Sequence, residues 1–306
     1  MVAVAFFSEV DDPEDWRRAL GAVLPEAEFR VAPALGDPAE IEAAMVWKPP
    51  AGFFAPMRKL KLVVNLGAGV DSLVGRDDLP PVPIARLNDP GMVQLMTSYV
   101  VFAVTRYARD IHHFERAQRR GAWEYRHPRA LDRIRVGVLG LGELGGPAAQ
   151  ALAGMGYSVT GWSRSPKSIP GVRWEGSLDA VLAESEILVA LVPLTPDTRG
   201  LIGAREFGLL PRGAKLVNAC RGPVVDEAAL LVALSDGTLE AATLDVFNQE
   251  PLPEGHPLWR MENVLITPHL ASITVPDSAA RDVAESIRRV LRGEPPLHQV
   301  DPGRGY

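Results

Sequence analysis

Three clusters of polar residues, far apart in the chain, each follow a stretch that is typical of a β-strand. They contain Arg221, Glu250 and His269. Because parallel strands end at one edge of a sheet, where open α/β folds bind their ligands, we expect these side chains to meet. A guanidinium group, a carboxylate and an imidazole in one place can catalyse the reduction of a carbonyl group by a bound hydride donor.

Each of the three residues has a role in this hypothesis. Arg221 can grip a carboxylate with two N–H donors and polarise a carbonyl oxygen. If Glu250 accepts one ring proton of His269, it fixes the tautomer and favours the protonated ring, so that His269 becomes a general acid. Hydride would pass from a nicotinamide to a carbonyl carbon, while His269 protonates the oxygen and Arg221 stabilises the developing negative charge.

A simpler interpretation exists for each residue. Alone, Arg221 is more often part of a structural ion pair, and Glu250 a solvated loop acid. Because the three candidates follow successive predicted strands, we treat them as one set. The other histidines are interpreted as surface or capping residues: His112 and His113 in a predicted helix, and His127, His256 and His298 in loops.

A glycine-rich turn precedes these clusters. It follows an apolar run at residues 135–139 and opens a predicted helix at 147–155, which leads to a second strand at 158–162. An isolated G-x-G-x-x-G is a weak signal, but this context is that of a dinucleotide-binding fold, with the helix amino end facing the phosphates. We expect Gly140 to make the tight turn, Gly142 to let backbone amides approach the pyrophosphate, and Gly145 to allow close helix packing. The predicted cofactor-binding residues here are Gly140, Gly142, Glu143, Leu144 and Gly145.

The residues after the second strand indicate the cofactor. An NAD enzyme usually has Asp or Glu there to bind the ribose hydroxyls. This chain has Ser163, Arg164 and Ser165, then Lys167, and no Asp or Glu from residue 144 to residue 174. Because an arginine fork with hydroxyl donors suits a 2′-phosphate dianion, we predict NADPH in preference to NADH. The alternative is that Arg164 and Lys167 are solvated loop residues.

The elements that must position these residues alternate between strands and helices, which predicts parallel sheets with helices on both faces. Asp12, followed by Pro13 and acids, predicts the start of the first helix. Short apolar or β-branched runs predict strands at residues 2–7, 28–31, 45–47, 62–65, 84–87, 135–139, 158–162, 215–219, 241–246 and 264–267.

Two longer helical patterns predict the domain organisation. Residues 91–119 show apolar residues, Tyr99 among them, every three or four positions without an internal Pro or Gly, which predicts one long helix. Residues 275–291 predict a second helix that crosses back. We expect an α/β protein of two parallel-sheet domains, Rossmann-like and flavodoxin-like. The nucleotide domain, residues 99–275, would be inserted in a substrate domain made of residues 1–98 and 276–306.

Composition limits the classes of function. The 306 residues are 47% hydrophobic and 23% charged, which is ordinary for globular proteins and enough for two cores. A net charge of −6 argues against nucleic acid as a partner and leaves a small molecule. The single cysteine, Cys220, permits no intramolecular disulfide and no cysteine-built zinc site, and we expect no metal. Residues 1–7 are interpreted as a strand and not a signal peptide, and the apolar stretches are too short to span a bilayer, so we expect a soluble, cytoplasmic protein.

Together these motifs resemble, in the same order and over essentially the whole chain, the D-isomer-specific 2-hydroxyacid dehydrogenases. Within that family, the chain is most similar to the glyoxylate/hydroxypyruvate reductase A branch, through residues 162–165 (WSRS), residues 47–50 (WKPP) and the end at 299–301 and 304–306. The segments that carry the family resemblance are 140–145 (GLGELG), 193–198 (PLTPDT), 218–222 (NACRG), 244–252 (LDVFNQEPL) and 267–269 (TPH).

The resemblance implies that Arg221, Glu250 and His269 are the catalytic residues, that Asp245 lies near the nicotinamide carboxamide, and that the chain forms a homodimer through the helix at 92–119. Cys220 stands where alanine is commoner in the family. Further cofactor-binding residues implied by the matched segments are Pro193, Thr198, Ala219 and Cys220.

The same resemblance identifies residues 66–71 (LGAGVD) as a substrate loop. There Gly67, Ala68 and Gly69 would leave backbone amides free to bind a carboxylate, although a plain turn between strand and helix fits the glycines equally. Trp47 would be a wall that limits the substrate to two or three carbons, or else a packed core aromatic.

We therefore predict an NADPH-dependent reductase of small 2-oxo acids, converting glyoxylate to glycolate and hydroxypyruvate to D-glycerate. One alternative is another D-2-hydroxyacid dehydrogenase, with a different 2-oxo acid or with NADH. The other is an NAD(P)-sensing, partner-binding protein on the same fold, because fold alone does not determine function.

Overall fold

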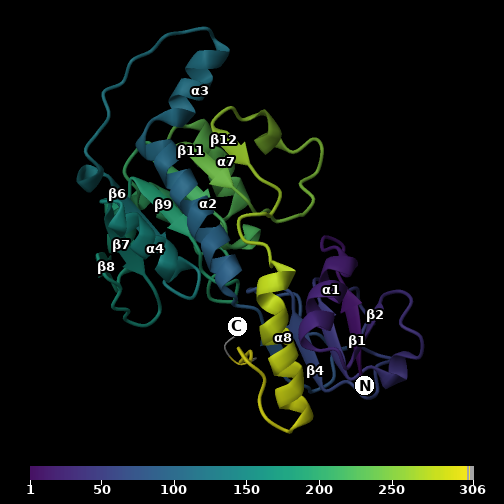
Figure 1. The fold of residues 1–306 in the computed structure, drawn as a ribbon. Helices are drawn as coiled ribbons and strands as arrows, with labels where there is room; N and C mark the ends of the chain where they lie inside the picture. Colours follow the sequence, from purple (N-terminus) through teal and green to yellow (C-terminus); the bar gives the residue numbers. More distant parts are fainter. Residues whose placement is uncertain (302, 304–306) are drawn as a thin grey trace. The chain divides into compact units, whose positions relative to one another are not determined.

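The computed structural model describes residues 1–301 and residue 303, and it divides the chain into two compact units (Figure 1). The first consists of Met1–Met92 and Ile273–Tyr306, and the second of Val93–Ser272. The second unit is thus inserted in the sequence of the first. These boundaries lie a few residues before those expected at residues 98 and 275. The part of the family resemblance at 304–306 lies outside the described residues.

The first unit contains a parallel sheet of five strands among the described residues, in the order β2-β1-β3-β4-β5. This is the order of flavodoxin-like folds. Its elements are β1 (Val2–Phe7), α1 (Pro13–Val23), β2 (Ala27–Val31), the short 3-10 helix η1 (Pro38–Glu40), β3 (Ala43–Val46), β4 (Leu62–Asn65), β5 (Ile84–Arg86) and α8 (Pro276–Leu291).

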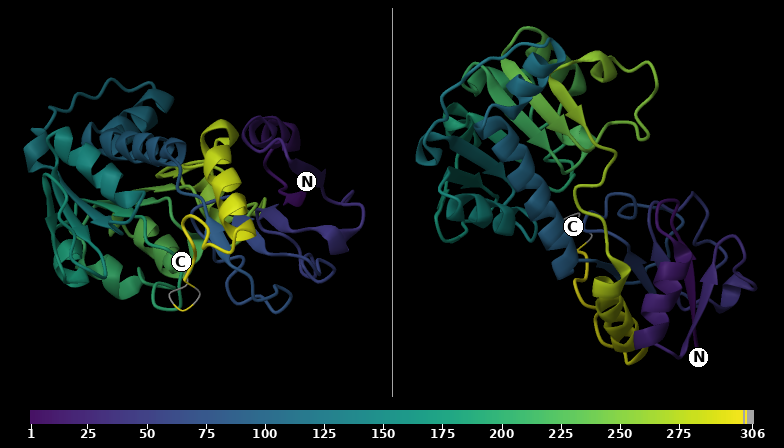
Figure 2. Two further views of the ribbon diagram at one scale, coloured as in Figure 1. Left: turned by 60° about the horizontal axis from the view of Figure 1, so that its bottom comes forward. Right: turned by 45° about the horizontal axis from the view of Figure 1, so that its top comes forward.

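The C-terminal helix α8 lies beside α1 in this unit (Figure 2). Arg18 of α1 pairs with Asp277 of α8 at 2.8 Å, and the Arg288 guanidinium donates to the Val23 carbonyl oxygen at 2.8 Å. As predicted, α1 begins after Asp12, whose side chain accepts a hydrogen bond from the first turn. The two ends of the chain therefore build one unit together.

The second unit contains a parallel sheet of seven strands among the described residues, in the order β8-β7-β6-β9-β10-β11-β12. Helix α2 begins in the first unit and continues into the second. The elements are α2 (Pro90–Ala108), α3 (Ile111–Arg119), η2 (Leu131–Arg133), β6 (Arg135–Leu139), α4 (Gly145–Gly154), β7 (Ser158–Trp162), β8 (Val172–Trp174), α5 (Leu178–Glu184), β9 (Ile187–Ala190), α6 (Ala204–Leu209), β10 (Ala214–Asn218), η3 (Gly222–Val224), α7 (Glu227–Ser235), β11 (Leu239–Leu244), η4 (Pro257–Arg260) and β12 (Val264–Ile266).

Helices cover both faces of this second sheet, and Figure 2 shows α2 crossing one of them. Successive strand residues point to opposite faces. On β9, Val189 packs in the core under α2 and α4, whereas Leu188 packs in the core under α5, α6 and α7. Burial on both faces explains why the strands are continuous apolar runs. Among residues 1–301 and 303, no helix combines the length and the hydrophobicity needed to cross a bilayer.

The prediction of a single long helix over residues 91–119 is wrong. Helix α2 ends at Ala108 and α3 begins at Ile111. Between them Asp110 has a φ of 56°, in the left-handed region that Asp tolerates better than most residues. The Asp110 carbonyl oxygen then accepts bonds from the N–H groups of His113 and Phe114, at 3.0 and 3.1 Å, which start the next helix.

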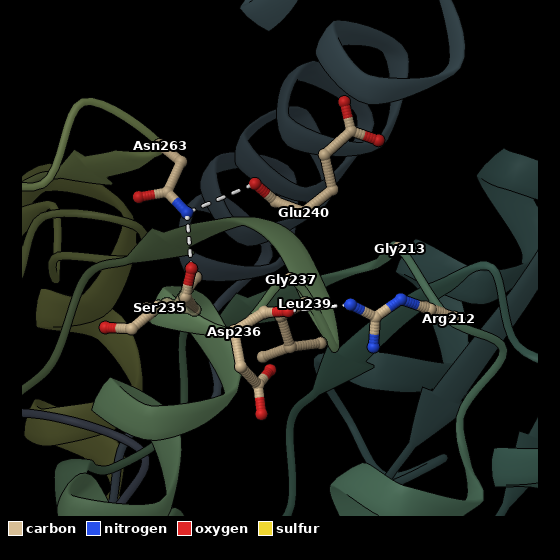
Figure 3. Close-up of a pocket in the computed structure, with 9 residues that line it drawn as sticks. Arg212, Gly213, Ser235, Asp236, Gly237, Leu239, Glu240 and Asn263 are labelled. Atoms are coloured by element: carbon tan, nitrogen blue, oxygen red, sulfur yellow. Dashed lines mark hydrogen bonds between the residues drawn. The ribbon is translucent and has the colours of Figure 1, made fainter.

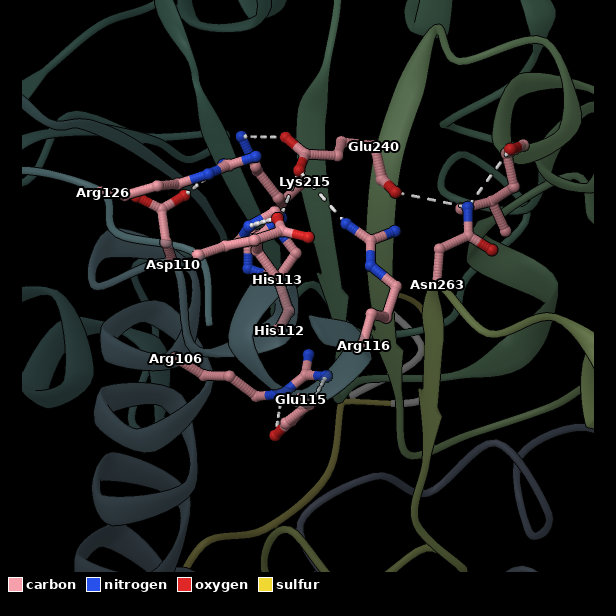
Figure 4. Close-up of polar contacts among 12 residues, drawn as sticks. Arg106, Asp110, His112, His113, Glu115, Arg116, Arg126, Lys215, Glu240 and Asn263 are labelled. Carbon is pink, nitrogen blue, oxygen red and sulfur yellow. Dashed lines mark hydrogen bonds and ion pairs between the residues drawn. The ribbon is translucent and has the colours of Figure 1, made fainter. Parts of the chain in front are cut away.

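The break places His112 inside the protein, so its interpretation as a surface or capping residue is also wrong. The residue is 3% exposed, and its Nε2 lies 2.9 Å from Glu240 Oε1 (Figure 4). Glu240, on β11, also pairs with Lys215 of β10 at 2.9 Å and with Arg116 of α3 at 3.6 Å. These contacts attach α3 to the amino ends of β10 and β11.

The remaining histidines outside the candidate site are mostly as predicted. His256 caps η4, because its Nδ1 accepts from the N–H of Leu258 at 3.3 Å, and His127 and His298 are exposed. His113 departs from the prediction, since its side chain is only 12% exposed and pairs with Glu124.

The Glu240 carboxylate should make the stability of this protein depend on pH. Its hydrogen bond with His112, and the nearby Lys215, outweigh partial burial and lower the pKa of Glu240 from 4.5 to about 2. A carboxylate with a depressed pKa in the folded state stabilises the fold above its unfolded value. That contribution is lost as the pH falls from about 4.5 toward about 2.

We therefore predict that Glu240→Gln lowers the free energy of unfolding at neutral pH by up to about 3 kcal/mol. Solvent screening of this partly exposed carboxylate makes the loss smaller than that upper value. The difference from wild type should shrink as the pH is lowered below about 4.5. Urea denaturation across this pH range measures it. Glu26→Gln, at the exposed pair with Arg288, is the control and should change little. A deficit for Glu240→Gln that does not vary with pH would contradict the assignment.

Candidate active site

The predicted site residues of the second unit lie in the segments that directly follow the carboxyl ends of its strands. Since all these strands are parallel, the segments share one edge of the sheet. They comprise Gly140, Gly142, Glu143, Leu144 and Gly145 after β6; Ser163, Arg164, Ser165 and Lys167 after β7; Pro193 and Thr198 after β9; Ala219, Cys220 and Arg221 after β10; Asp245 and Glu250 after β11; and His269 after β12.

A hollow of about 500 Å³ lies at the opposite, amino edge of this sheet (Figure 3). Its lining comes from the segments that precede or begin β10, β11 and β12, and parallel sheets bind their ligands at the other edge. Asn263 braces this region, because its Nδ2 donates to the carbonyl oxygens of Leu234 and Glu240, both at 3.2 Å. We do not assign the hollow to the reaction. It is lined by Arg212, Gly213, Leu234, Ser235, Asp236, Gly237, Leu239, Glu240 and Asn263.

Glu250 and His269 are brought together by neighbouring strands. The Nδ1 atom of His269 lies 2.8 Å from Glu250 Oε2, and the other oxygen, Oε1, accepts from the N–H of Phe247 at 3.1 Å. A carboxylate only accepts, so Nδ1 is the protonated donor of this pair. The ring is thereby fixed in orientation, with Nε2 as its second nitrogen for proton transfer. The side chains of His269 and Glu250 are 25% and 21% exposed.

The loop that carries His269 is wrapped around a buried carboxylate. Asp245 is 1% exposed, and its Oδ1 accepts from Thr267 Oγ1 at 2.6 Å and from the Leu270 N–H at 2.9 Å. Its Oδ2 accepts from the Ala271 N–H at 2.9 Å. The His269 N–H donates to the Asp245 carbonyl oxygen at 2.8 Å, and His269 has a φ of 54°. These bonds hold His269 in a conformation that non-glycine residues rarely adopt.

Tyr99 extends this network from helix α2, a role that no local sequence pattern predicts. Its hydroxyl lies 2.7 Å from Thr267 Oγ1. Because the Thr267 hydroxyl donates to Asp245, Tyr99 donates to Thr267. Burial raises the pKa of Tyr99 to about 12, so the phenol keeps its proton at neutral pH. In the sequence, Tyr99 belongs to the apolar stripe of a predicted helix, and no local pattern links it to Thr267.

Arg221 follows β10, the strand next to β11. The loop of Arg221 packs closely against the loop of Glu250: a Cβ added at Gly222 would overlap the backbone of Phe247. The Nη1 atom of Arg221 donates to the Cys220 carbonyl oxygen at 2.8 Å. Cys220 is buried beside Asn218, and burial raises the pKa of its thiol to about 11. The thiol is therefore protonated at neutral pH and is a poor nucleophile.

The geometry of the glycine turn fits a dinucleotide. Gly140 has a φ of 99°, and a Cβ at Gly145 would overlap the Gly140 carbonyl oxygen. These two glycines are required by the turn and by the packing of α4, which begins at Gly145. At Gly142, by contrast, a Cβ would meet nothing within 4 Å. Gly142 and the helix amino end therefore leave room for a phosphate to approach the backbone.

The loop after β7 presents exposed cations. Arg164 and Lys167 are both exposed, and the loop is shaped by Ser163, whose hydroxyl donates to the Ser165 carbonyl oxygen at 2.7 Å. Arg173, the other basic residue of this stretch, bonds to Glu184 and to Thr160. After β9, Thr198 closes the loop that begins at Pro193 by donating to its carbonyl oxygen at 2.6 Å.

In the first unit, residues 66–71 follow β4 at the carboxyl edge of that sheet. Trp47 packs directly on this loop, since a Cβ at Gly67 would lie 2.5 Å from the Trp47 ring atom Cζ3. Lys48 Nζ lies 5.6 Å from the centre of the Trp47 ring. Trp47 is thus a packed aromatic that also borders the loop of Gly67, Ala68 and Gly69.

This chain is similar to known proteins. The family profile described as D-isomer specific 2-hydroxyacid dehydrogenase, NAD binding domain, matches residues 101–271. A glyoxylate/hydroxypyruvate reductase A of Serratia proteamaculans is 39% identical over an alignment of 312 positions, which covers 99% of this chain and 99% of that protein.

Solved structures agree over the full length. A D-isomer specific 2-hydroxyacid dehydrogenase of Xanthobacter autotrophicus Py2, in complex with NADPH and MES, is 57% identical with a TM-score of 0.95, covering 100% of this chain and 99% of that one. An NADPH-dependent glyoxylate/hydroxypyruvate reductase of Sinorhizobium meliloti, in complex with NADP and sulfate, is 35% identical with a TM-score of 0.94 and covers 100% of both chains. This chain belongs to the D-isomer-specific 2-hydroxyacid dehydrogenase family.

Proposed function

We propose that this protein is an NADPH-dependent reductase of small 2-oxo acids, converting glyoxylate to glycolate and hydroxypyruvate to D-glycerate. The observation that carries the proposal is the 2.8 Å bond between His269 Nδ1 and Glu250 Oε2 at the carboxyl edge of a dinucleotide-type sheet. Similarity to reductases of these two substrates supports the choice of substrate. Another 2-oxo acid, NADH as cofactor, and a sensor without turnover are the alternatives.

In the proposed mechanism, the chain supplies a proton and a positive field. NADPH, when bound, supplies the hydride that forms the new C–H bond. The electron pair of the carbonyl π bond moves to oxygen, which takes a proton from His269, while Glu250 stabilises the imidazolium before transfer and Arg221 stabilises the charge on oxygen. The Asp245 network holds His269 at the required place.

The proposed substrate residues are Arg221 and His269, with the amides of the loop at Gly67, Ala68 and Gly69. The loop would bind the substrate carboxylate, which suits backbone N–H groups that converge in a turn. Trp47, packed on that loop, would limit the length of the substrate beyond its carbonyl carbon.

The first test is the loss of NADPH absorbance with glyoxylate and with hydroxypyruvate, compared with pyruvate and with NADH. Replacing His269 with Gln should lower kcat/KM by roughly 10²- to 10⁴-fold, because the general acid is lost. His256→Gln is a matched control, because His256 also pairs with a carboxylate, Glu227, at 3.2 Å. It should leave turnover unchanged. Normal turnover by His269→Gln would refute the acid role, and a wild-type chain that binds NADPH without turnover would favour the sensor.

The second test concerns the choice of cofactor. Arg164→Ala should raise the KM for NADPH roughly tenfold and change the KM for NADH little, because only NADPH carries the 2′-phosphate. Arg173→Ala is the control, since Arg173 is bonded to Glu184 and should affect stability more than selectivity. Equal effects of Arg164→Ala on both cofactors would remove the argument.

We also propose a cytoplasmic homodimer through the segment at 92–119, now α2 and α3. Phe102 of α2 is apolar yet 52% exposed. Phe102→Asp should therefore shift the sedimentation velocity from dimer to monomer. Val232→Asp, at a 63% exposed position on α7, should leave it unchanged. A wild-type monomer, or a dimer insensitive to Phe102→Asp, would contradict this interface.

A further inference from the structure

Asn65 lies beneath the loop at 66–71 and binds it twice. It is the last residue of β4 and is fully buried. Its Nδ2 donates to the carbonyl oxygen of Gly67 at 2.8 Å and to that of Gly69 at 3.1 Å. These two partners identify the nitrogen of the side-chain amide, because a carbonyl oxygen accepts only from the NH₂ group.

The two bonds determine where the amide N–H groups of the loop point. In a trans peptide, the N–H is directed opposite to the carbonyl group of the same peptide unit. The Gly67 carbonyl belongs to the peptide unit of the Ala68 N–H, and the Gly69 carbonyl to that of the Val70 N–H. Both N–H groups are therefore directed away from Asn65. Within the part of the chain that the structure describes, neither donates to a protein acceptor.

Other groups turn the neighbouring carbonyls inward as well. The buried hydroxyl of Thr274 donates to the Leu66 carbonyl oxygen at 3.0 Å, and the Leu87 N–H donates to the Gly67 carbonyl oxygen at 3.2 Å. The carbonyl side of the loop is thus occupied by donors from within its own unit. The opposite side presents N–H groups, whose partial positive charges favour an anion.

The side-chain amide of Asn65 includes a destabilising feature. Its Oδ1 is buried and has no hydrogen-bond partner among the described residues. An unpartnered buried oxygen is unfavourable, so the position is explained by what the NH₂ group does. Aspartate has the same shape but only accepts when ionised, and it would face two carbonyl oxygens.

We propose that Asn65 is a positioning residue for substrate recognition: it orients the N–H groups of Ala68 and Val70 to bind the carboxylate of a 2-oxo acid. This inference rests on the proposed function and adds a residue that does not itself touch the substrate. Its effect should appear in the affinity for carboxylate ligands, and little in cofactor binding.

The experiment measures the steady-state kinetics of Asn65→Ala and Asn65→Asp with glyoxylate and NADPH. Both variants should raise the KM for glyoxylate about tenfold or more, because two loop carbonyls lose their donor. Asn65→Asp should be the worse, because its carboxylate would face those two carbonyl oxygens. The KM for NADPH, and kcat at saturating glyoxylate, should stay within about threefold of wild type. Competitive inhibition by oxalate, a carboxylate probe that is not reduced, should weaken by a similar factor.

Asn263→Ala is the matched control for a purely structural role. Asn263 also donates through Nδ2 to two backbone carbonyl oxygens, but in the second unit and at the amino edge of its sheet (Figure 3). It should lower the Tm without changing the KM for glyoxylate. If the Asn65 variants lower the Tm and leave the KM for glyoxylate and the inhibition by oxalate as in Asn263→Ala, the proposal is wrong.

A separate binding measurement distinguishes failure of this inference from failure of the proposed function. Wild-type protein that reduces no small 2-oxo acid would refute the function. Oxalate should still raise the Tm of wild type and raise that of Asn65→Ala much less. If oxalate stabilises both equally, or neither, Asn65 does not organise a carboxylate site. Asn65→Ala alone is sufficient if Asn65→Asp does not fold.

Discussion

The geometry of the candidate site depends on the buried carboxylate of Asp245. A carboxylate removed from water is costly unless its oxygens are satisfied. Asp245 meets this requirement with the Thr267 hydroxyl and the N–H groups of Leu270 and Ala271. All three donors belong to the loop after β12, so the loop must curl around the carboxylate. His269 lies within that curl, and its position follows from the solvation of Asp245.

Buried polar side chains bind loop backbone at other strand ends as well. Asn65 ends β4, Asn218 ends β10 and Asp245 follows β11, and all three are at most 2% exposed. Each binds the backbone of a loop at its own edge of the sheet. Asn218 accepts from the Cys220 N–H and donates to the Arg221 carbonyl oxygen, both at 3.3 Å. A buried polar side chain at the end of a strand thus fixes the shape of the loop that follows it.

Local sequence patterns were sufficient where burial alone determines structure. The bounds of β1, β4, β6 and β7 agree with the predicted strands, because an apolar run between polar turns has few alternatives in a parallel sheet. The predicted dinucleotide turn agrees for a similar reason: Gly140 and Gly145 occupy positions where a side chain is strained or overlaps backbone. Such requirements are local, and they leave a local signature.

The failures involve partners that are distant in sequence. The break at Asp110 is marked by no Pro or Gly, and it is stabilised by what α3 then reaches: His112 bonds to Glu240, on a strand more than a hundred residues later. Tyr99 binds Thr267 across a similar separation. Periodicity identified Tyr99 as inward-facing but could not distinguish a packed aromatic from a hydrogen-bond donor. The pairing is a property of the fold and has no counterpart in either segment alone.

Strand β11 has a carboxylate at each end, and each carboxylate binds a different part of the second unit. At the amino end, Glu240 fastens α3 through His112, and just beyond the carboxyl end, Asp245 organises the loop of His269. Between them Thr243 bonds to the buried Tyr107 hydroxyl of α2 at 2.7 Å. Helix α2 is therefore attached to the sheet by Tyr107 through β11 and by Tyr99 through the loop after β12. Because α2 contributes to both attachments, a displacement of this helix would be transmitted to Thr267, and from there to the carboxylate that holds His269 in place.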